Sequence, residues 1–171
     1  MRQRCVAERA IPAFFLILVA MVLIGHPPKG SAAEIVVPNA QTTARGNGNN
    51  VIPFSCQGAF GPSMRYQQVY AAGEVGTGTI TQIAFRQFTN PAFTGTLLGV
   101  TLTLSSTSNG PDTLSATFAA NVGADVKTVF SGDLTLSGGE APAGPGPFDA
   151  LIPLQTSFTF DAARARISSW T

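Results

Sequence analysis

The strict alternation of apolar and small or hydroxyl-bearing residues over residues 98–105 constrains the fold more than any other feature of the chain. Residues of one kind fall on one face of an extended strand and residues of the other kind on the opposite face; the apolar ones are Leu98, Val100, Leu102 and Leu104. Successive side chains of a β-strand point to opposite sides, so this period of two is typical of a strand with one buried face. It predicts that the four apolar side chains belong to the core.

A similar alternation occurs twice within residues 64–87, where two extended runs flank a glycine-rich segment. In the first run, Tyr66, Gln68 and Tyr70 point to one side and the intervening residues to the other. Two alternating runs around a glycine-rich turn are typical of a β-hairpin. We therefore expect a central hairpin here.

The rest of the chain after residue 33 also favours short strands. Further strands are expected at residues 34–38, 126–130, 133–137, 148–154 and 157–160, with a tight turn at Ser131 and Gly132, and a short helix at residues 113–121. Many short strands separated by turns, without βαβ spacing, are typical of an antiparallel β-sandwich. The predicted fold class is all-β, an antiparallel β-sandwich similar to a jelly roll, with one short helix.

The N-terminus has the three parts of an export signal. Basic residues at Arg2, Arg4 and Arg9 precede an apolar run at residues 11–25, and small residues at 31–33 suit a cleavage site. The alternative is a retained membrane anchor, but the run is shorter than the roughly 20 residues that a spanning helix needs. We expect a signal helix cleaved after Ala33, a single domain at residues 34–171, and a secreted or cell-surface protein that meets the membrane only before cleavage.

Cleavage would remove His26, the only histidine, and leave a slightly acidic chain. A chain without a basic patch is a poor partner for nucleic acid. Ser-His-Asp and Cys-His catalysis and histidine-based metal sites are excluded with the histidine. A paired-carboxylate glycosidase remains as the alternative, but acids in turns usually bond to nearby backbone. The prediction is a protein that is not an enzyme.

Two groups of residues are candidate binding sites. Asn121, Asp125 and Asp133 offer oxygen ligands of the kind that Ca²⁺ prefers, although the pattern of an EF-hand is missing. Tyr66, Gln68 and Tyr70 form a polar aromatic stripe that suits a sugar or another surface, with core packing as the alternative. No cofactor other than calcium is expected, and the candidate partners are extracellular polysaccharide and other envelope proteins.

Several segments carry a resemblance to a group of exported bacterial proteins, many of which end in the PEP-CTERM sorting signal. They are RYQQVYAAGEV, TITQIAFRQ, TLTLSSTS, LSATFAANVGADVKTVFSG and FTFD, within residues 53–161. The resemblance implies export to the cell surface or matrix, a β-sandwich, and no catalytic residues to carry over. The function expected is that of a non-enzymatic structural or adhesive module, with a carbohydrate-binding or carbohydrate-active domain as the alternative.

The chain departs from this group at residues 162–171, which lack the apolar strand and sorting signal that such proteins place there. Loss of a last strand would leave an unpaired sheet edge. We therefore expect a domain truncated at its C-terminal end, with Phe158 and Phe160 exposed and a tail that does not complete the sheet; a natural short tail is the alternative.

Overall fold

A computed structural model describes residues 33–44, 54, 63–88, 92–140, 144–163 and 166–169. The predicted signal peptide lies outside the described residues, apart from Ala33. The chain divides at that point, and residues 34–171 form one compact unit. All the elements described below belong to this unit.

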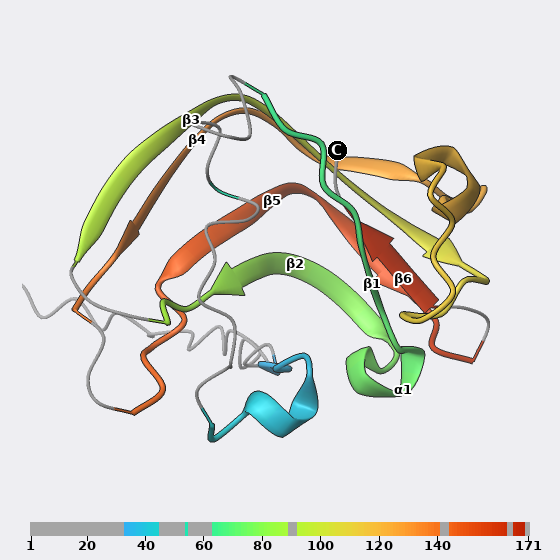
Figure 1. Cartoon of the computed structure of the whole chain (residues 1–171), viewed down its shortest axis with the longest axis horizontal. Coiled ribbons are helices and arrows are strands. Elements are labelled where there is room, and N and C mark those ends of the chain that lie inside the picture. The colour runs from blue at the N-terminus through green and yellow to red at the C-terminus, as the bar shows by residue number, and fades with distance from the viewer. Residues whose placement is uncertain are drawn as a thin grey trace, which may run out of the picture. The chain divides into compact units, whose positions relative to one another are not determined.

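Strands in two antiparallel sheets make up most of the regular secondary structure of the described chain (Figure 1). The four-stranded sheet has the order β1-β6-β3-β4, and the two-stranded sheet pairs β2 with β5. The elements are η1 (Asn39–Gln41), β1 (Gln68–Tyr70), α1 (Ala72–Val75), β2 (Gly78–Phe85), β3 (Phe93–Thr107), η3 (Phe118–Asn121), β4 (Lys127–Gly138), β5 (Ala150–Phe160) and β6 (Arg166–Ser169). The prediction of an antiparallel, mainly β protein is confirmed.

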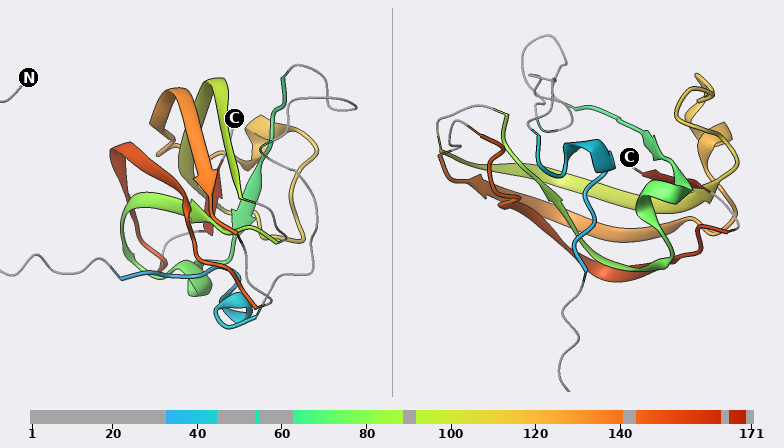
Figure 2. Two further views of the ribbon diagram at one scale, coloured as in Figure 1. Left: turned by 90° about the vertical axis from the view of Figure 1, so that its left-hand side faces the viewer. Right: turned by 90° about the horizontal axis from the view of Figure 1, so that it is seen from below.

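One apolar cluster is shared by strands of both sheets. Its buried members come from β3, β4 and β5: Leu102, Leu104, Val129, Phe130, Leu134, Leu136, Ile152, Phe158 and Phe160. Figure 2 shows β3 and β4 running along each other beside β5. Half-buried Ile80 and Ile83 of β2 pack against the same cluster. Burying one such side chain stabilises a fold by about 1.5–3 kcal/mol, so this cluster is the main apolar contribution to stability.

The longest strand, β3, follows the predicted alternation over only part of its length. Leu102 and Leu104 are buried, but Leu98 is 78% exposed. The register against β4 shifts between Leu97 and Val100, and Gly99 between them has a φ of 63°. A bulge adds one residue to a strand and so changes the face to which its neighbours point. The prediction that Leu98 lies in the core is wrong for this reason.

Residues 64–87 do not form the predicted hairpin. β1 pairs with β6 in one sheet and β2 pairs with β5 in the other. Helix α1 lies between β1 and β2, and Gly76, with a φ of 71°, follows its last residue. A positive φ costs glycine little and other residues more. The glycine-rich segment therefore connects two sheets, where the sequence suggested one tight turn.

Two predicted breaks within strands are also wrong. Ser131 and Gly132 continue β4, and Gly132 pairs with Val100 of β3. β5 runs without interruption through Gln155, and the register against β2 shifts between Ile80 and Gln82. Glycine inside a strand marks a bulge as readily as a turn. Each expected pair of short strands is one long strand with an irregular register.

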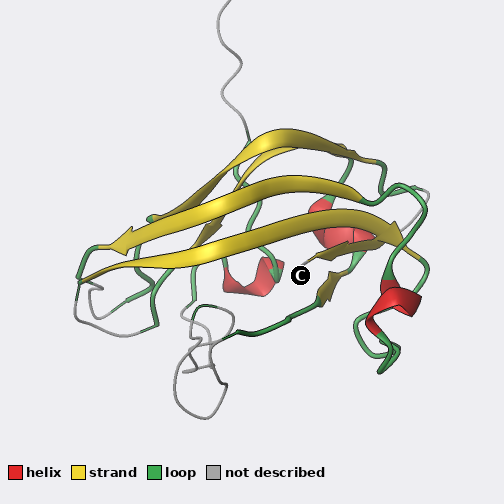
Figure 3. Ribbon diagram, turned by 90° about the horizontal axis from the view of Figure 1, so that it is seen from above, coloured by secondary structure: helices red, strands yellow, loops and turns green. Residues whose placement is uncertain are grey.

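The ends of the unit differ from expectation as well. Residues 34–38, expected to be a strand, precede η1 without being part of any strand. At the other end, β6 pairs with β1 and β3 (Figure 3), and Phe158 and Phe160 are only 3% and 1% exposed. The expectations that the tail adds no strand and that these phenylalanines are exposed are wrong.

A side chain of β5 links the two sheets at the edge of β4. Gln155 Nε2 donates to the carbonyl oxygen of Ser131 at 3.1 Å, and the Ser131 backbone N–H donates to Gln155 Oε1 at 3.0 Å. Lys127 Nζ of β4 donates to the Ser157 carbonyl oxygen of β5 at 2.9 Å. In the part of the chain that the structure describes, β4 is the last strand of its sheet. These side-chain bonds therefore take the place of a ladder between β4 and β5.

Candidate functional site

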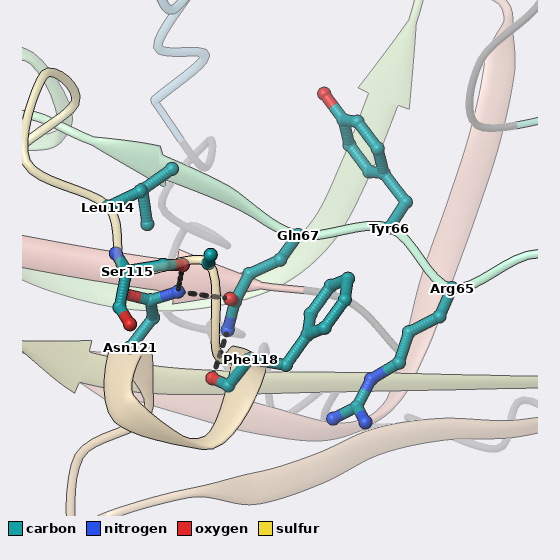
Figure 4. A pocket seen from close by; sticks show the side chains of 8 residues that line it. Arg65, Tyr66, Gln67, Leu114, Ser115, Phe118 and Asn121 are labelled. Atoms are coloured by element: carbon teal, nitrogen blue, oxygen red, sulfur yellow. Dashed lines mark hydrogen bonds between the residues drawn. The ribbon is translucent and has the colours of Figure 1, made fainter.

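A pocket of about 300 Å³ lies between the segment that leads into β1 and the loop that connects β3 to β4. Its lining residues come from these two stretches, which are far apart in sequence: Arg65, Tyr66, Gln67, Leu114, Ser115, Ala116, Phe118 and Asn121. Figure 4 shows the Gln67 side chain pointing toward Asn121 and Phe118, and Arg65 beside Phe118. This volume is at the lower end of the range for small-molecule sites, roughly 300–1,000 Å³.

Asn121 is the fixed centre of this region and is only 2% exposed. Its Nδ2 donates to Gln67 Oε1 at 2.8 Å and to the Ser115 carbonyl oxygen at 2.9 Å. Its Oδ1 accepts from the Ser115 backbone N–H and from Asn109 Nδ2, both at 2.8 Å. The amide of Asn121 therefore uses both donors and both lone pairs of its oxygen within the protein.

The same bonds correct the prediction of a helix over residues 113–121. Asn121 holds both the N–H and the carbonyl of Ser115, so the backbone at Ser115 is bonded to a side chain. An asparagine side chain that bonds to nearby backbone competes with helix formation. The helical part is limited to η3, and Leu114 lies in the loop before it with 39% of its surface exposed.

Gln67 joins the two stretches that form the pocket. Its Nε2 donates to the Phe118 carbonyl oxygen at 3.3 Å, and its Oε1 accepts from Asn121. Ser115 Oγ accepts from the Thr117 backbone N–H at 3.1 Å. A serine hydroxyl that accepts one bond still has its own hydrogen to donate. The floor of the pocket is thus fixed, and the exposed Ser115 hydroxyl retains a donor.

Arg65 and Arg86 both stack on phenylalanine rings. The guanidinium carbon of Arg65 lies 4.5 Å from the ring centroid of Phe118, and that of Arg86 lies 4.7 Å from the centroid of Phe148. Arg86 also donates to the carbonyl oxygens of Gln41 and Ala44. The guanidinium of Arg65 has no hydrogen bond or ion pair with another described residue. Arg65 therefore lines the pocket with its N–H donors unused by the described residues.

The predicted ligand stripe packs largely against the protein itself. Tyr66 and Tyr70 are half-buried against the apolar cluster, and Tyr66 Oη donates to Gln68 Oε1 at 2.9 Å. Burial raises the pKa of Tyr66. The pKa of Tyr70 is raised from 10.0 to about 12, mainly by burial and in second place by the charge of Tyr66. These contacts match the core-packing alternative, and Tyr66 alone of the three borders the pocket.

The three candidate calcium ligands have separate partners. Asn121 has the four bonds above, Asp125 Oδ1 accepts from the Ser106 N–H at 2.8 Å, and Asp133 Oδ1 accepts from the Gly99 N–H at 2.9 Å. Among the described residues no three or more His, Cys, Asp or Glu side chains are grouped so that they could hold a metal ion. These contacts give no support to the calcium hypothesis.

Other acidic side chains also bond to backbone. Asp149 Oδ2 accepts from the Gly139 N–H at 2.6 Å, and Glu74 Oε1 accepts from the Asn39 N–H at 3.3 Å. Glu74 lies in α1 and Asp149 directly precedes β5, and each accepts its bond from a segment outside that element.

None of the helices in the described part of the chain has the length and apolar character that crossing a bilayer requires.

Sequence reasoning missed most of the pocket. Arg65 and Phe118 meet only because Gln67 and Asn121 connect two distant stretches, and no linear pattern marks that connection. The unusual run from Leu114 to Asn121 was the nearest signal, but its spacing indicated a helix. The geometry of these residues is the basis for any functional assignment. No family model, curated protein or solved structure matches the chain.

Proposed function

We propose that the protein is an exported, non-enzymatic β-sandwich that serves in the cell envelope or extracellular matrix as a structural or adhesive module. The observation that carries this proposal is the use of four carboxylates as connectors. Each accepts a backbone N–H from a different segment: Glu74 from Asn39, Asp125 from Ser106, Asp133 from Gly99, and Asp149 from Gly139.

These bonds favour a structural role for the acids over catalysis. A glycosidase places two carboxyl groups about 5–10 Å apart, one on each side of the scissile bond. Asp125 instead fixes the end of β3 from the loop before β4, and Asp133 of β4 fixes the bulge of β3. A hydrogen bond to a charged group stabilises a fold by about 1.5–3 kcal/mol. The acids thus stabilise irregular backbone in a sheet with several register shifts.

The sandwich arrangement is part of the proposal. It is supported by the apolar cluster to which β3, β4 and β5 contribute and against which β2 packs. Export is supported by the basic, apolar and small-residue segments of residues 1–33. The resemblance to exported proteins with the PEP-CTERM sorting signal suggests the same location.

Carbohydrate binding is the second candidate function, and the pocket favours binding over turnover. The described residues that line it include an arginine, two amides, the hydroxyls of Tyr66 and Ser115 and apolar side chains, and no carboxylate among them. Such a lining supplies hydrogen bonds and contact area, but not the pair of carboxyl groups that glycoside cleavage uses.

Fractionation of cells that express the full chain tests the proposal. We expect a peptide that begins at Glu34 in the envelope or culture fluid, identified by mass spectrometry. Protein that keeps Met1 and stays in the cytoplasm would contradict it. Reducing-sugar release from extracellular polysaccharides should equal the blank, and turnover that Asp125→Asn abolishes would favour the carbohydrate-active alternative.

A further inference from the structure

The pocket combines one exposed cation with a rigid polar floor. Arg65 is the one charged group among its lining residues, and Phe118 holds the guanidinium at 4.5 Å from the ring centroid. Stacking on an aromatic ring limits the conformations of an arginine, so less side-chain entropy is lost when its planar fork binds a ligand. Arginine binds carboxylates through two parallel N–H bonds. The pocket is therefore suited to a carboxylate ligand.

The other groups define the rest of the ligand. The amide of Asn121 is saturated by Gln67, Ser115 and Asn109, so it shapes the floor without binding. The Ser115 hydroxyl retains a donor, and Leu114 adds an exposed apolar wall. A ligand with one carboxylate, an acceptor oxygen and an apolar face, small enough for about 300 Å³, has these complementary features.

We propose that the pocket binds an acidic sugar residue, a hexuronate, within an extracellular polysaccharide. In this arrangement Arg65 binds the carboxylate, Ser115 donates to a ring hydroxyl oxygen, and Leu114 contacts the C–H face of the sugar ring. The inference depends on the proposed function, because it names the ligand of an adhesive module outside the cell. A hexuronate is favoured over a peptide carboxylate because the pocket offers a second donor, the Ser115 hydroxyl, beside Arg65 and only one short apolar wall.

Binding of an alginate hexasaccharide to the full chain, measured by isothermal titration calorimetry, tests the proposal. The matched ligand is the same oligosaccharide after chemical reduction of its carboxyl groups. We expect Arg65→Gln to weaken binding of the acidic form about tenfold to a hundredfold, the range for a hydrogen bond to a charged group. Arg65→Lys should weaken it less, because lysine keeps the charge but loses the fork.

Lys127→Gln is the matched protein control. It also removes one positive charge from the described chain, but Lys127 bonds to Ser157 and is absent from the pocket. Binding should stay within about twofold of the unchanged protein, since an exposed charge that does not line the pocket is screened by salt. Thermal unfolding of each variant shows that the fold is intact, which we expect because Arg65 is exposed.

Four results would overturn the proposal: no binding of the acidic oligosaccharide, equal binding of its reduced form, equal weakening by Lys127→Gln, or equally tight binding of a peptide through its C-terminal carboxylate. Each leaves the envelope location untouched, because fractionation tests that separately. A cytoplasmic location would remove the proposed function itself.

Discussion

The apolar cluster around Leu102 and the polar cluster around Asn121 are both buried, but they depend on different properties of the sequence. Leu102 is 0% exposed and touches other apolar side chains of two sheets. Asn121 is 2% exposed and is bonded through all its polar positions to Gln67, Ser115 and Asn109. Apolar packing accepts many similar side chains, whereas each hydrogen bond needs a particular partner at a particular place.

This difference explains why only one cluster has a visible pattern. Most residues of the apolar cluster lie two apart along a strand, as Leu102 and Leu104, Leu134 and Leu136, and Phe158 and Phe160 do. The partners of Asn121 are isolated residues in a loop and in an extended segment before β1, and each occurs once. Three comparisons of paired variants and one single variant, followed over a range of pH, break or sharpen the contrast.

The largest effect is expected from Leu102→Ala. Removing a fully buried leucine leaves a cavity and should lower the free energy of unfolding by about 2–5 kcal/mol in urea denaturation. Leu98→Ala is the matched control, the same substitution in the same strand at a side chain that is 78% exposed. It should change stability by about 0.5 kcal/mol or less. Equal losses at the two sites would show that Leu98 is also packed.

Asn121→Ala should lower the free energy of unfolding by about 1–3 kcal/mol, because Ser115 and Gln67 lose buried partners. The control is Asn39→Ala, which removes an exposed amide that donates to the Val36 and Glu74 carbonyls. Its effect should be smaller. Asn121→Asp sharpens the contrast: it should also destabilise, since a carboxylate oxygen would face the carbonyl of Ser115. Tolerance of that nearly isosteric change would contradict the hydrogen-bond argument.

Gly99→Ala should cost about 1–2 kcal/mol, because the φ of 63° is unfavourable for a residue with a Cβ atom. No heavy atom outside the chain neighbours lies within 4 Å of the added methyl group, so the cost comes from the backbone alone. Gly95→Ala in the same strand is the control, equally open and without a positive φ. The difference between their unfolding midpoints measures the bulge, and no difference would mean that the bulge relaxes.

The remaining prediction is a dependence on alkaline pH. Burial, and second the charge of Tyr66, raise the pKa of Tyr70 from 10.0 to about 12. The folded state therefore holds its proton more tightly than the unfolded state does, and stability is lost as the pH rises from about 10 toward 12. Tyr70→Phe should reduce this loss in urea denaturation at several alkaline pH values. If Tyr70→Phe loses as much stability at alkaline pH as the unchanged protein, groups other than Tyr70 cause the loss.

The sequence alone gives the β class and half of the core face of β3, but not the way strands connect. Leu102 and Leu104 follow the alternation, and Leu98 departs from it because a bulge at Gly99 is not visible in the period of the pattern. Gly132 lies inside β4, but its glycine indicated a turn, because the pattern does not distinguish a glycine within a strand from one in a turn. Of the candidate site residues, Tyr66 and Asn121 line the pocket, but Arg65 and Phe118 could not be paired, because long-range hydrogen bonds bring them together.

The bond between Gln155 and Ser131 also bears on self-association. An extended chain that docks on the edge of a sheet does so by offering one carbonyl and one N–H to each outward-facing residue. At Ser131 the amide of Gln155 already offers both, with an oxygen at 3.0 Å from the nitrogen and a nitrogen at 3.1 Å from the oxygen. A second copy of the protein that approached this edge would have to displace both of these bonds to form its own two at Ser131, and so would gain no net hydrogen bond there. One neutral side chain thus makes the middle of β4 a poor template for growth into a larger sheet.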